Sequence, residues 1–290
     1  MRIRVEAPSS PFSPQKLQAG LARLRGAGFH VDDRAAVVRC GHAYLNGDDD
    51  ARRRSLEEAL TADVDIVWLA RGGYGLTRIV DQLKLPARPP RVVGFSDATA
   101  LFGRLARGGF ADRVVHGPLA TTLADEPAES FADLLAVLHG RATKVTGLSA
   151  IHPLDEVDIS APVFCGNLCV LTHLIGTGSM PDLQGAILVV EEVGERPYRI
   201  DRMATHLIQS GAVAGLAAVV IGHLTGCSEP NNPPGAPTPV DVLRERFGTL
   251  GVPVFYGAPV GHEAPNFPVP LRPARLRARG GAWQMEFEGA

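Results

Sequence analysis

Apolar and polar positions alternate over about the first 120 residues in a way that predicts strands and helices in turn. Short apolar runs predict strands at 3–7, 29–31, 65–70, 92–93 and 114–115. Apolar residues at helical spacing predict intervening helices at 13–26, 48–60, 76–83 and 97–107. Strands joined by helices pair in parallel with right-handed crossovers, so their carboxyl ends share one edge of a sheet, where ligands bind.

The second half of the chain resumes this alternation after a break. Between about 137 and 162 the periodicity is lost among glycines and prolines, so we expect lobes at 1–140 and 163–290 with a linker at 141–162. Further elements are predicted, with helices at 166–175 and 198–209, strands at 187–190 and 217–221, and a proline-rich loop at 228–239. The predicted fold class is α/β, with an N-terminal parallel-sheet lobe of Rossmann or flavodoxin-like type and a smaller C-terminal α/β lobe.

Composition and charge indicate a folded globular protein with no general attraction to polyanions. Apolar residues make up 45% and charged residues 21% of the 290 positions, which argues against disorder despite 32 glycines and 23 prolines. The net charge is −2, from 29 basic and 31 acidic residues, so we expect neither nucleic acid nor a membrane as a partner. The densest basic run, 52–54, lies between acidic residues and is interpreted as the solvated face of a helix.

The four cysteines form no metal-binding or redox pattern. Cys40, Cys165, Cys169 and Cys227 include no Cys-x-x-Cys pair and no zinc-finger spacing, so free thiols are expected. No apolar stretch is long enough for a signal peptide or a membrane span. These features predict a cytoplasmic protein without a metal site.

The strongest chemical signal is Ser96, which stands between an apolar strand and a helix in the Gly-Phe-Ser-Asp-Ala segment 94–98. A strand that turns at once into a helix leaves the first helical amides free to face a developing oxyanion. The segment shares Gly-x-Ser with the hydrolase elbow but lacks its final glycine. Ser96 is therefore either a nucleophile or a helix N-cap. The glycine turn at 71–75 ends the preceding predicted strand, so the two corners should lie side by side.

A hydrolytic serine needs a base and an acid that orients the base. Among nine histidines, His116 and His223 end predicted strands, and His262 stands in a glycine-flanked loop after the apolar run 252–256. Each of the three is a candidate base, and the alternative for each is a structural hydrogen bond that holds its loop.

The candidate acids, Glu191 and Glu192, follow the buried run 187–190. Because side chains alternate across a strand, only one of the two can share the face that meets the site. A buried carboxylate needs a partner, since leaving it unpaired costs on the order of several kcal/mol. That partner is either a histidine or one of three nearby arginines: Arg196, Arg199 and Arg202.

Six motifs, taken together and in order, resemble the LD-carboxypeptidases, a family that includes murein tetrapeptide carboxypeptidases and microcin-resistance peptidases. They are Ala-Arg-Gly-Gly-Tyr-Gly at 70–75, Gly-Phe-Ser-Asp-Ala-Thr-Ala at 94–100, His-Gly-Pro at 116–118, Gly-Asn-Leu at 166–168, Glu-Glu at 191–192 with the segment 197–203, and Gly-His-Glu at 261–263. The resemblance runs from the first predicted strand to about residue 271 with similar spacing.

The resemblance implies a serine peptidase with a Ser-Glu-His triad and no metal or other cofactor. By motif, Ser96 matches the family's nucleophile, Glu191 its orienting acid and His262 its general base. The serine then comes from the N-terminal lobe and the other two residues from the C-terminal lobe, which places the active site between the lobes. The resemblance also implies an oxyanion hole formed by the backbone amides of Gly73 and Asp97.

The implied activity is cleavage of an L,D-peptide bond that releases terminal D-alanine from cytoplasmic murein tetrapeptides during cell-wall recycling, by a homodimer. Arg71 is a candidate anchor for the free carboxylate of the substrate, with a loop-stabilising salt bridge as the alternative. One rival function keeps the triad and changes the substrate to a microcin-like peptidyl-nucleotide. Another is a catalytically silent ligand-binding protein.

Two positions depart from the family pattern. Cys165 stands where a second glycine is usual before Gly-Asn-Leu, and Arg272 stands where glycine is common. Because both lie outside the proposed triad, we expect them to affect substrate preference, by narrowing a pocket, rather than the proton transfers.

Overall fold

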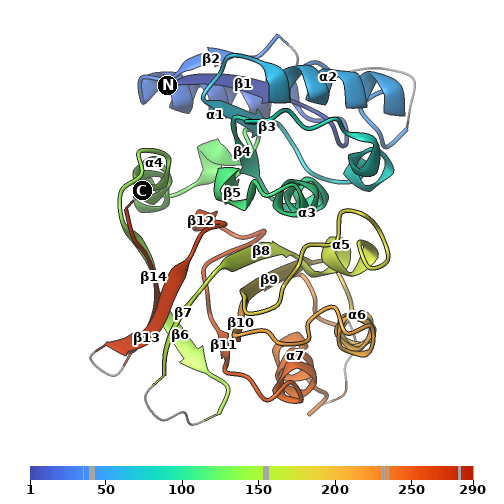
Figure 1. Ribbon diagram of the computed structural model, residues 1–290, viewed down its shortest axis with the longest axis vertical. Helices are drawn as coiled ribbons and strands as arrows, with labels where there is room; N and C mark the ends of the chain where they lie inside the picture. Colours follow the sequence, from blue (N-terminus) through green and yellow to red (C-terminus); the bar gives the residue numbers. More distant parts are fainter. Residues whose placement is uncertain are drawn as a thin grey trace.

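The protein has two lobes that stack on one another in the computed structural model (Figure 1). The structure describes residues 1–34, 36–38, 43–152, 157–229, 231, 233, 235–279 and 282–289. Cys40, predicted to be a free thiol, lies outside the described residues, as do parts of the predicted linker and of the proline-rich loop.

The first lobe is built on a six-stranded sheet in the order β12-β5-β4-β3-β1-β2. Its strands are β1 (Arg2–Glu6), β2 (His30–Asp32), β3 (Ile66–Leu69), β4 (Arg91–Gly94), β5 (Val114–His116) and β12 (Val269–Pro270). The first five are parallel, and β12, from the far end of the chain, pairs antiparallel with β5. The order 2-1-3-4-5 is that of flavodoxin-like sheets, which bind ligands at the carboxyl edge. The predicted fold class is confirmed.

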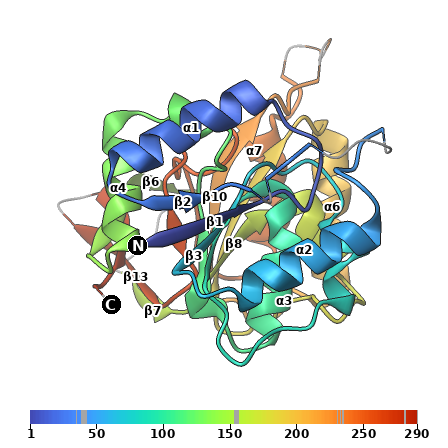
Figure 2. The same cartoon turned by 90° about the horizontal axis from the view of Figure 1, so that it is seen from above.

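Helices cover both faces of this sheet (Figure 2). One face carries α1 (Pro14–Gly26) and α4 (Ala128–Leu138), and the other carries α2 (Asp49–Thr61) and α3 (Thr99–Arg107). The leucines that predict α1 are buried against the sheet and α4, because helical spacing places them on one side. Short 3₁₀ helices complete the lobe: η1 (Leu76–Arg78), η2 (Val80–Gln82), η3 (Ser96–Ala98), η4 (Ala111–Arg113) and η5 (Leu123–Asp125).

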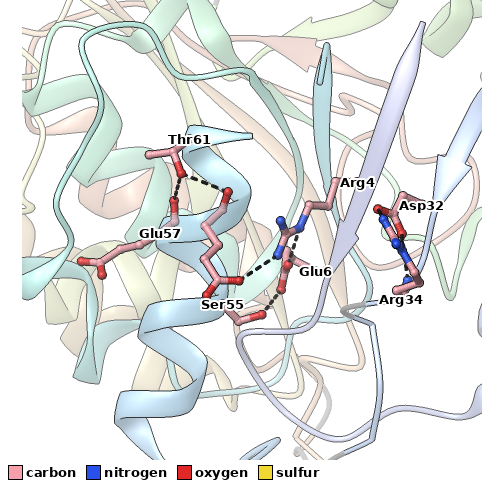
Figure 3. A network of polar contacts seen from close by, with 8 residues as sticks. Arg4, Glu6, Asp32, Arg34, Ser55, Glu57 and Thr61 are labelled. Atoms are coloured by element: carbon pink, nitrogen blue, oxygen red, sulfur yellow. Dashed lines mark hydrogen bonds and ion pairs between the residues drawn. The ribbon is translucent and has the colours of Figure 1, made fainter. Parts of the chain in front are cut away.

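Polar contacts fix α2 against β1 at the carboxyl end of the strand (Figure 3). The carboxylate of Glu6 is buried, and Ser55 Oγ donates to its Oε2 at 2.8 Å. Arg4 Nε donates to Glu6 Oε1 at 2.9 Å, while Arg4 Nη2 lies 3.6 Å from Glu58 Oε2 on α2. Because a buried carboxylate is stable only with such partners, these bonds hold the helix in register on the strand.

The second lobe is built on an eight-stranded mixed sheet in the order β7-β13-β14-β6-β11-β10-β9-β8. Its strands are β6 (Thr143–Ala150), β7 (Asp158–Ala161), β8 (Val163–Asn167), β9 (Ile187–Val193), β10 (Ala218–Thr225), β11 (Val254–Tyr256), β13 (Ala274–Arg279) and β14 (Ala282–Phe287). β8 to β11 are parallel, and the other pairings are antiparallel. The helices of this lobe are α5 (Leu168–His173), α6 (Pro197–Gln209) and α7 (Pro239–Gly248).

Several predicted elements differ from those observed. The range 141–162, predicted as a linker, contains β6 and β7. The alternation of β6 is interrupted at Gly147, whose φ is 77°, where its register against β14 is also irregular. The predicted helix at 76–83 is the pair of 3₁₀ helices η1 and η2. The predicted helix at 166–175 begins two residues later, because Gly166 and Asn167 belong to β8.

Arg52 corrects the interpretation of the basic run as a solvated helix face. Its side chain is fully buried, whereas Arg54 is exposed. Arg52 Nη1 donates to the carbonyls of Pro8 and, at 3.0 Å, of Gly75, and its Nη2 pairs with Asp49 Oδ1 at 2.5 Å. The run predicts a helix correctly, but its first arginine points inward and links α2 to the glycine turn.

The two lobes share one continuous apolar core. It runs from residues of α2 and α3 in the first lobe to residues of β9, β10 and β14 in the second. Hydrogen bonds cross the same boundary: Asn167 N donates to Thr99 Oγ1 at 2.9 Å, and Ser179 Oγ donates to Asp81 Oδ1 at 2.5 Å. No helix among the described residues is both long and apolar enough to cross a membrane.

Candidate active site

Ser96 lies where β4 ends and η3 begins, in a strained backbone conformation. Its φ is 65°, in the left-handed region that residues other than glycine rarely occupy. The capping positions are taken by Phe95 and Ala98, without side-chain capping bonds, so the N-cap role considered for Ser96 is wrong. Ser96 is partly exposed, although its neighbours Phe95 and Asp97 are buried, and its side chain lines a cavity described below.

The glycine turn after β3 packs directly against this corner, as the sequence predicts. A Cβ on Gly72 would lie 3.0 Å from Ser96 Cβ and 3.2 Å from its Oγ, so only glycine fits there without displacing the serine. Gly73, at a φ of 99°, packs on Ser10, whose Oγ accepts from Tyr74 N at 3.1 Å. Among the described residues, neither the Gly73 amide nor the Asp97 amide has an acceptor.

The side chain of Asp97 ties the two corners together. Its carboxylate is buried and accepts from Leu76 N at 3.0 Å. Burial raises the pKa of this carboxyl, while nearby hydrogen-bond donors and the charge of Arg52 oppose the shift. Sequence reasoning singled out only the Asp97 amide and missed this role, which an acidic residue directly after a candidate nucleophile could have signalled.

The second lobe brings Glu191 and His262 into direct contact. His262 Nδ1 donates to Glu191 Oε2 at 2.6 Å. Glu191 is fully buried on β9, while the His262 side chain keeps 17% of its surface exposed. This bond fixes the imidazole so that Nε2 is the nitrogen left for other partners. The rings of His262 and Phe95 pack in a T-shaped arrangement, with ring centroids 4.7 Å apart.

The loop that carries His262 is positioned by close packing and by the first lobe. A Cβ on Gly261, whose φ is 135°, would lie 3.0 Å from Glu191 Oε2, so glycine allows the loop to approach the carboxylate. Gly261 N donates to Asn266 Oδ1, and Asn266 N donates to Glu126 Oε2, each at 3.0 Å. Glu126 and Asn266 were missed by sequence reasoning, because their contact joins residues 140 positions apart.

Glu192 points to the opposite side of β9, which confirms the alternation predicted for the glutamate pair. Its Oε1 accepts from Asn167 Nδ2 at 3.0 Å, and its Oε2 accepts from Cys169 N at 2.7 Å. Burial raises the pKa of the Glu192 carboxyl. Neither glutamate pairs with the nearby arginines among the described residues, where Arg196 and Arg199 instead contact Glu229 and Glu195.

The other two candidate histidines lie behind the site. His116 is fully buried on β5, with its ring 5.8 Å from that of Phe95, and neither ring nitrogen has a partner among the described residues. Burial lowers the pKa of His116 to about 4, with the charge of Glu191 opposing the shift. His223 N donates to Val260 O at 2.8 Å, which holds β10 against the loop of His262.

A cavity of about 550 Å³ opens between the lobes over these residues. Its lining residues are Phe12, Ser13, Lys16, Arg71, Gly72, Gly73, Phe95, Ser96, Leu119, Thr121, Thr122, Val193 and His262. Val193 and His262 come from the second lobe and the rest from the first. The cavity therefore lies at the carboxyl edge of the first sheet, in the size range of small-ligand sites.

The structure brings most of the predicted site residues to this cavity. Ser96, His262, Gly73 and Arg71 line it, and Glu191 lies directly beneath His262. Among the described residues, Ser96 Oγ makes no hydrogen bond to His262, which is common before a substrate is bound. Arg71 Nη1 donates to the carbonyl of Pro11 and has no carboxylate partner in the described part of the chain.

The two departures from the family pattern lie outside this cavity. Cys165 is fully buried on β8, and Arg272 follows β12 with its Nε and Nη2 unpartnered among the described residues. Neither side chain lines the cavity, so the expectation that they narrow the substrate pocket is not supported. No group of three or more metal-ligating side chains occurs within the described ranges.

An α/β fold that gathers a serine, an imidazole and a buried carboxylate at one cavity has the arrangement of a hydrolase. Family models match two segments of the chain: the LD-carboxypeptidase N-terminal domain over residues 3–117 and the LD-carboxypeptidase C-terminal domain over residues 160–274. The chain belongs to the LD-carboxypeptidase family, and the resemblance drawn from its motifs is confirmed.

Relatives and solved structures agree with this assignment. The murein tetrapeptide carboxypeptidase of Pseudomonas aeruginosa is 30% identical over 281 residues, covering 91% of this chain and 89% of that protein. The crystal structure of muramoyltetrapeptide carboxypeptidase from Oxalobacter formigenes has a TM-score of 0.86 at 29% identity and covers 99% of each chain. An MccF-like protein from Bacillus anthracis shares the fold, with a TM-score of 0.84 at 22% identity over 100% of this chain and 97% of that one.

Proposed function

We propose that this protein is a serine-type LD-carboxypeptidase that releases terminal D-alanine from murein tetrapeptides. Ser96 is the nucleophile, His262 the general base and Glu191 the acid that orients it. The observation that carries the proposal is the 2.6 Å bond from His262 Nδ1 to the buried Glu191, which leaves Nε2 available in a cavity also lined by Ser96.

The reaction proceeds by acyl transfer. His262 Nε2 takes the Ser96 proton as Oγ attacks the carbonyl carbon that precedes the terminal residue. The protonated His262 then gives that proton to the departing amine, which leaves an ester on Ser96. Water, deprotonated by His262, hydrolyses the ester and restores the serine. Glu191 stabilises the imidazolium in both halves, and the scheme requires no metal or other cofactor.

The amides of Gly73 and Asp97 are the proposed oxyanion donors. Both flank the nucleophile, and neither has an acceptor among the described residues, so both are free to donate to the tetrahedral intermediate. These two donors are expected to contribute strongly to the rate, because removing one such donor in a serine peptidase costs about 100- to 1,000-fold in turnover. The Asp97 carboxylate, bonded to Leu76 N, keeps the two donor segments in register.

The substrate assignment draws on the named relatives and on the charge of the cavity. A carboxypeptidase must bind the free carboxylate of its substrate, and Arg71, beside the Gly72–Gly73 turn, is the proposed anchor. The three described cysteines are free thiols, which suits the reducing cytoplasm where recycled murein peptides are trimmed. A homodimer remains the assembly that we propose from the family.

Kinetic analysis of Ser96→Ala tests the proposal. We expect release of D-alanine from a defined murein tetrapeptide to fall by about 10⁴-fold or more with an unchanged melting temperature, because the variant loses only the attacking oxygen. Ser160→Ala, at an exposed position on β7, is the matched control and should keep full activity. An undiminished rate in Ser96→Ala would exclude the serine mechanism. If the protein cleaves a peptidyl-nucleotide and not the tetrapeptide, the proposed substrate is wrong and the proposed serine mechanism still holds.

A further inference from the structure

The loop that carries His262 is closed by hydrogen bonds between its two arms. Phe267 N donates to Pro259 O at 2.7 Å, and Gly261 N donates to the side-chain Oδ1 of Asn266 at 3.0 Å. Asn266 is buried and its Nδ2 has no partner among the described residues, so the bond to Gly261 is the only one that this side chain makes there. Asn266 therefore fixes the backbone immediately before His262.

A carboxylate of the first lobe holds Asn266 in turn. Glu126 Oε2 accepts from Asn266 N at 3.0 Å and from Ser130 Oγ at 2.8 Å. The Glu126 side chain is buried, and within the described ranges no cation lies at ion-pair distance from its carboxylate. A buried carboxylate without a cation depends on its hydrogen-bond donors, so the bond to Asn266 N is costly to lose.

Glu126 lies in a segment that is attached to two helices of the first lobe. Arg23 on α1 donates through Nη1 to the backbone carbonyls of Leu123, at 2.8 Å, and of Glu126 itself. The Arg23 guanidinium also lies over the ring of Phe131 on α4, with Cζ 4.2 Å from the ring centroid. Glu126 therefore presents its carboxylate to the His262 loop from a fixed position.

Packing alone does not fix the His262 loop on the side that faces α4. A second cavity, of about 360 Å³, lies there and shares no lining residue with the one that Ser96 lines. Its lining includes Ser130 on α4 and three residues of the loop: Pro259, Pro265 and Phe267. Side chains that face a cavity lack the contacts that hold a close-packed segment. The bond between Glu126 and Asn266 supplies a restraint that packing does not.

We propose that Glu126 is a positioning residue for the general base. Through Asn266, it sets where the imidazole of His262 lies relative to the nucleophile, which belongs to the same lobe as Glu126. This inference rests on the proposed function, in which His262 is the base. Loss of the bond to Asn266 should slow the chemical step and leave substrate binding nearly unchanged, because Glu126 does not line the substrate cavity.

The test compares Glu126→Leu, which removes the acceptor, with Glu126→Gln, whose amide oxygen can accept the same two hydrogen bonds. We expect kcat for release of D-alanine to fall by about 10- to 100-fold in Glu126→Leu with KM nearly unchanged, because small misplacement of a reacting group is costly. Glu126→Gln should restore kcat to within about threefold of wild type, because a neutral acceptor forms the same bonds less strongly. Glu129→Leu, at an exposed position on α4, is the matched control and should keep full activity.

A spectroscopic measurement tests the position of the imidazole without any substrate. The Nδ1 proton of His262, held in the 2.6 Å bond to Glu191, should give a low-field proton resonance in NMR spectra of wild type. We expect this resonance to shift or broaden in Glu126→Leu and to keep its wild-type position in Glu126→Gln. If wild type releases no D-alanine, the proposed function fails, and this comparison still decides whether Glu126 positions His262.

Two outcomes would overturn the inference. One is a Glu126→Leu variant that melts at a lower temperature but keeps the wild-type kcat and resonance, because Glu126 would then only stabilise the fold. The other is an equal fall in kcat in Glu126→Gln, since the amide offers the same acceptor.

If Glu126→Leu does not fold, Asn266→Ala provides the same test. This variant keeps the backbone bond to Glu126 and removes only the acceptor for Gly261 N. It should show the same fall in kcat and the same change in the His262 resonance, and wild-type values for both would overturn the inference.

Discussion

Ser96 and His116 are each held by the fold in an unfavourable situation: Ser96 in its backbone conformation, and His116 in its buried environment. A φ of 65° at Ser96 costs on the order of 1–3 kcal/mol and persists only because buried neighbours on both sides define the backbone. His116 is an imidazole buried in an apolar wall of the site, against the rings of Phe95 and Phe102. Ser96 shares the cavity with His262, and the ring of Phe95 packs against both His116 and His262.

The stability of the protein should depend on pH through His116. Its folded pKa is about 4, against about 6.5 when unfolded, so its stabilising effect is complete above pH 6.5 and is lost as the pH falls toward 4. At about 1.4 kcal/mol per pH unit, the loss between pH 6.5 and 5 is about 2 kcal/mol. Urea unfolding of wild type and His116→Phe at pH 7 and pH 5 measures this contribution. Wild type should lose about 2 kcal/mol more than the variant on acidification, and equal losses would contradict the assignment.

At the scale of elements, the site depends on how closely the glycine turn approaches the corner after β4. The two segments follow neighbouring strands of a parallel sheet, so their proximity results from the strand order. Gly72 allows contact with the Ser96 side chain, and Asp97 fixes the distance by accepting from the start of η1. A change at this contact alters the position of the nucleophile more than the stability of either segment.

Gly72→Ala tests this contact. The added methyl would lie 3.0 Å from Ser96 Cβ, so the serine must move by a few tenths of an ångström. We expect kcat to fall by about 10- to 100-fold, because small misplacement of a reacting group is costly, while the melting temperature changes little. Gly26→Ala is the matched control, since a Cβ there meets no atom within 4 Å. Full activity in Gly72→Ala would show that the approach of the turn does not position the serine.

At the scale of the whole molecule, the lobes are parts of one packed body. The shared core, the return of β12 to the first sheet and the bond from Asn266 N to Glu126 Oε2 all cross between them. Glu126 therefore supports the loop of His262 from the lobe that carries Ser96. The relative position of serine and histidine is thus set by packing along the lobe boundary as well as by the loops themselves.

The sequence predicted the parts of this arrangement that local patterns encode. The strands of the first lobe, the corner at Ser96, the adjacent glycine turn and the opposite orientations of Glu191 and Glu192 follow from periodicity and alternation. The six motifs predicted membership of the LD-carboxypeptidase family, which the comparisons confirm.

Other parts depend on contacts that no local pattern contains. β6 and β7 form only because distant strands pair with them, and the edge strand β12 is two residues long. Arg52 is buried because the carbonyls of Pro8 and Gly75, far away in the chain, accept its hydrogen bonds. Lys16 on α1 and Arg71 beside the glycine turn likewise line one cavity only because the fold brings these two elements together.

The most direct measurement of the central claim is covalent labelling by a fluorophosphonate, located by mass spectrometry of peptide fragments. The account predicts one adduct per chain, on Ser96, formed at a rate that falls by several orders of magnitude in His262→Ala, because the serine depends on that base. Stoichiometric labelling at another residue, or none under conditions where the protein releases D-alanine, would contradict it.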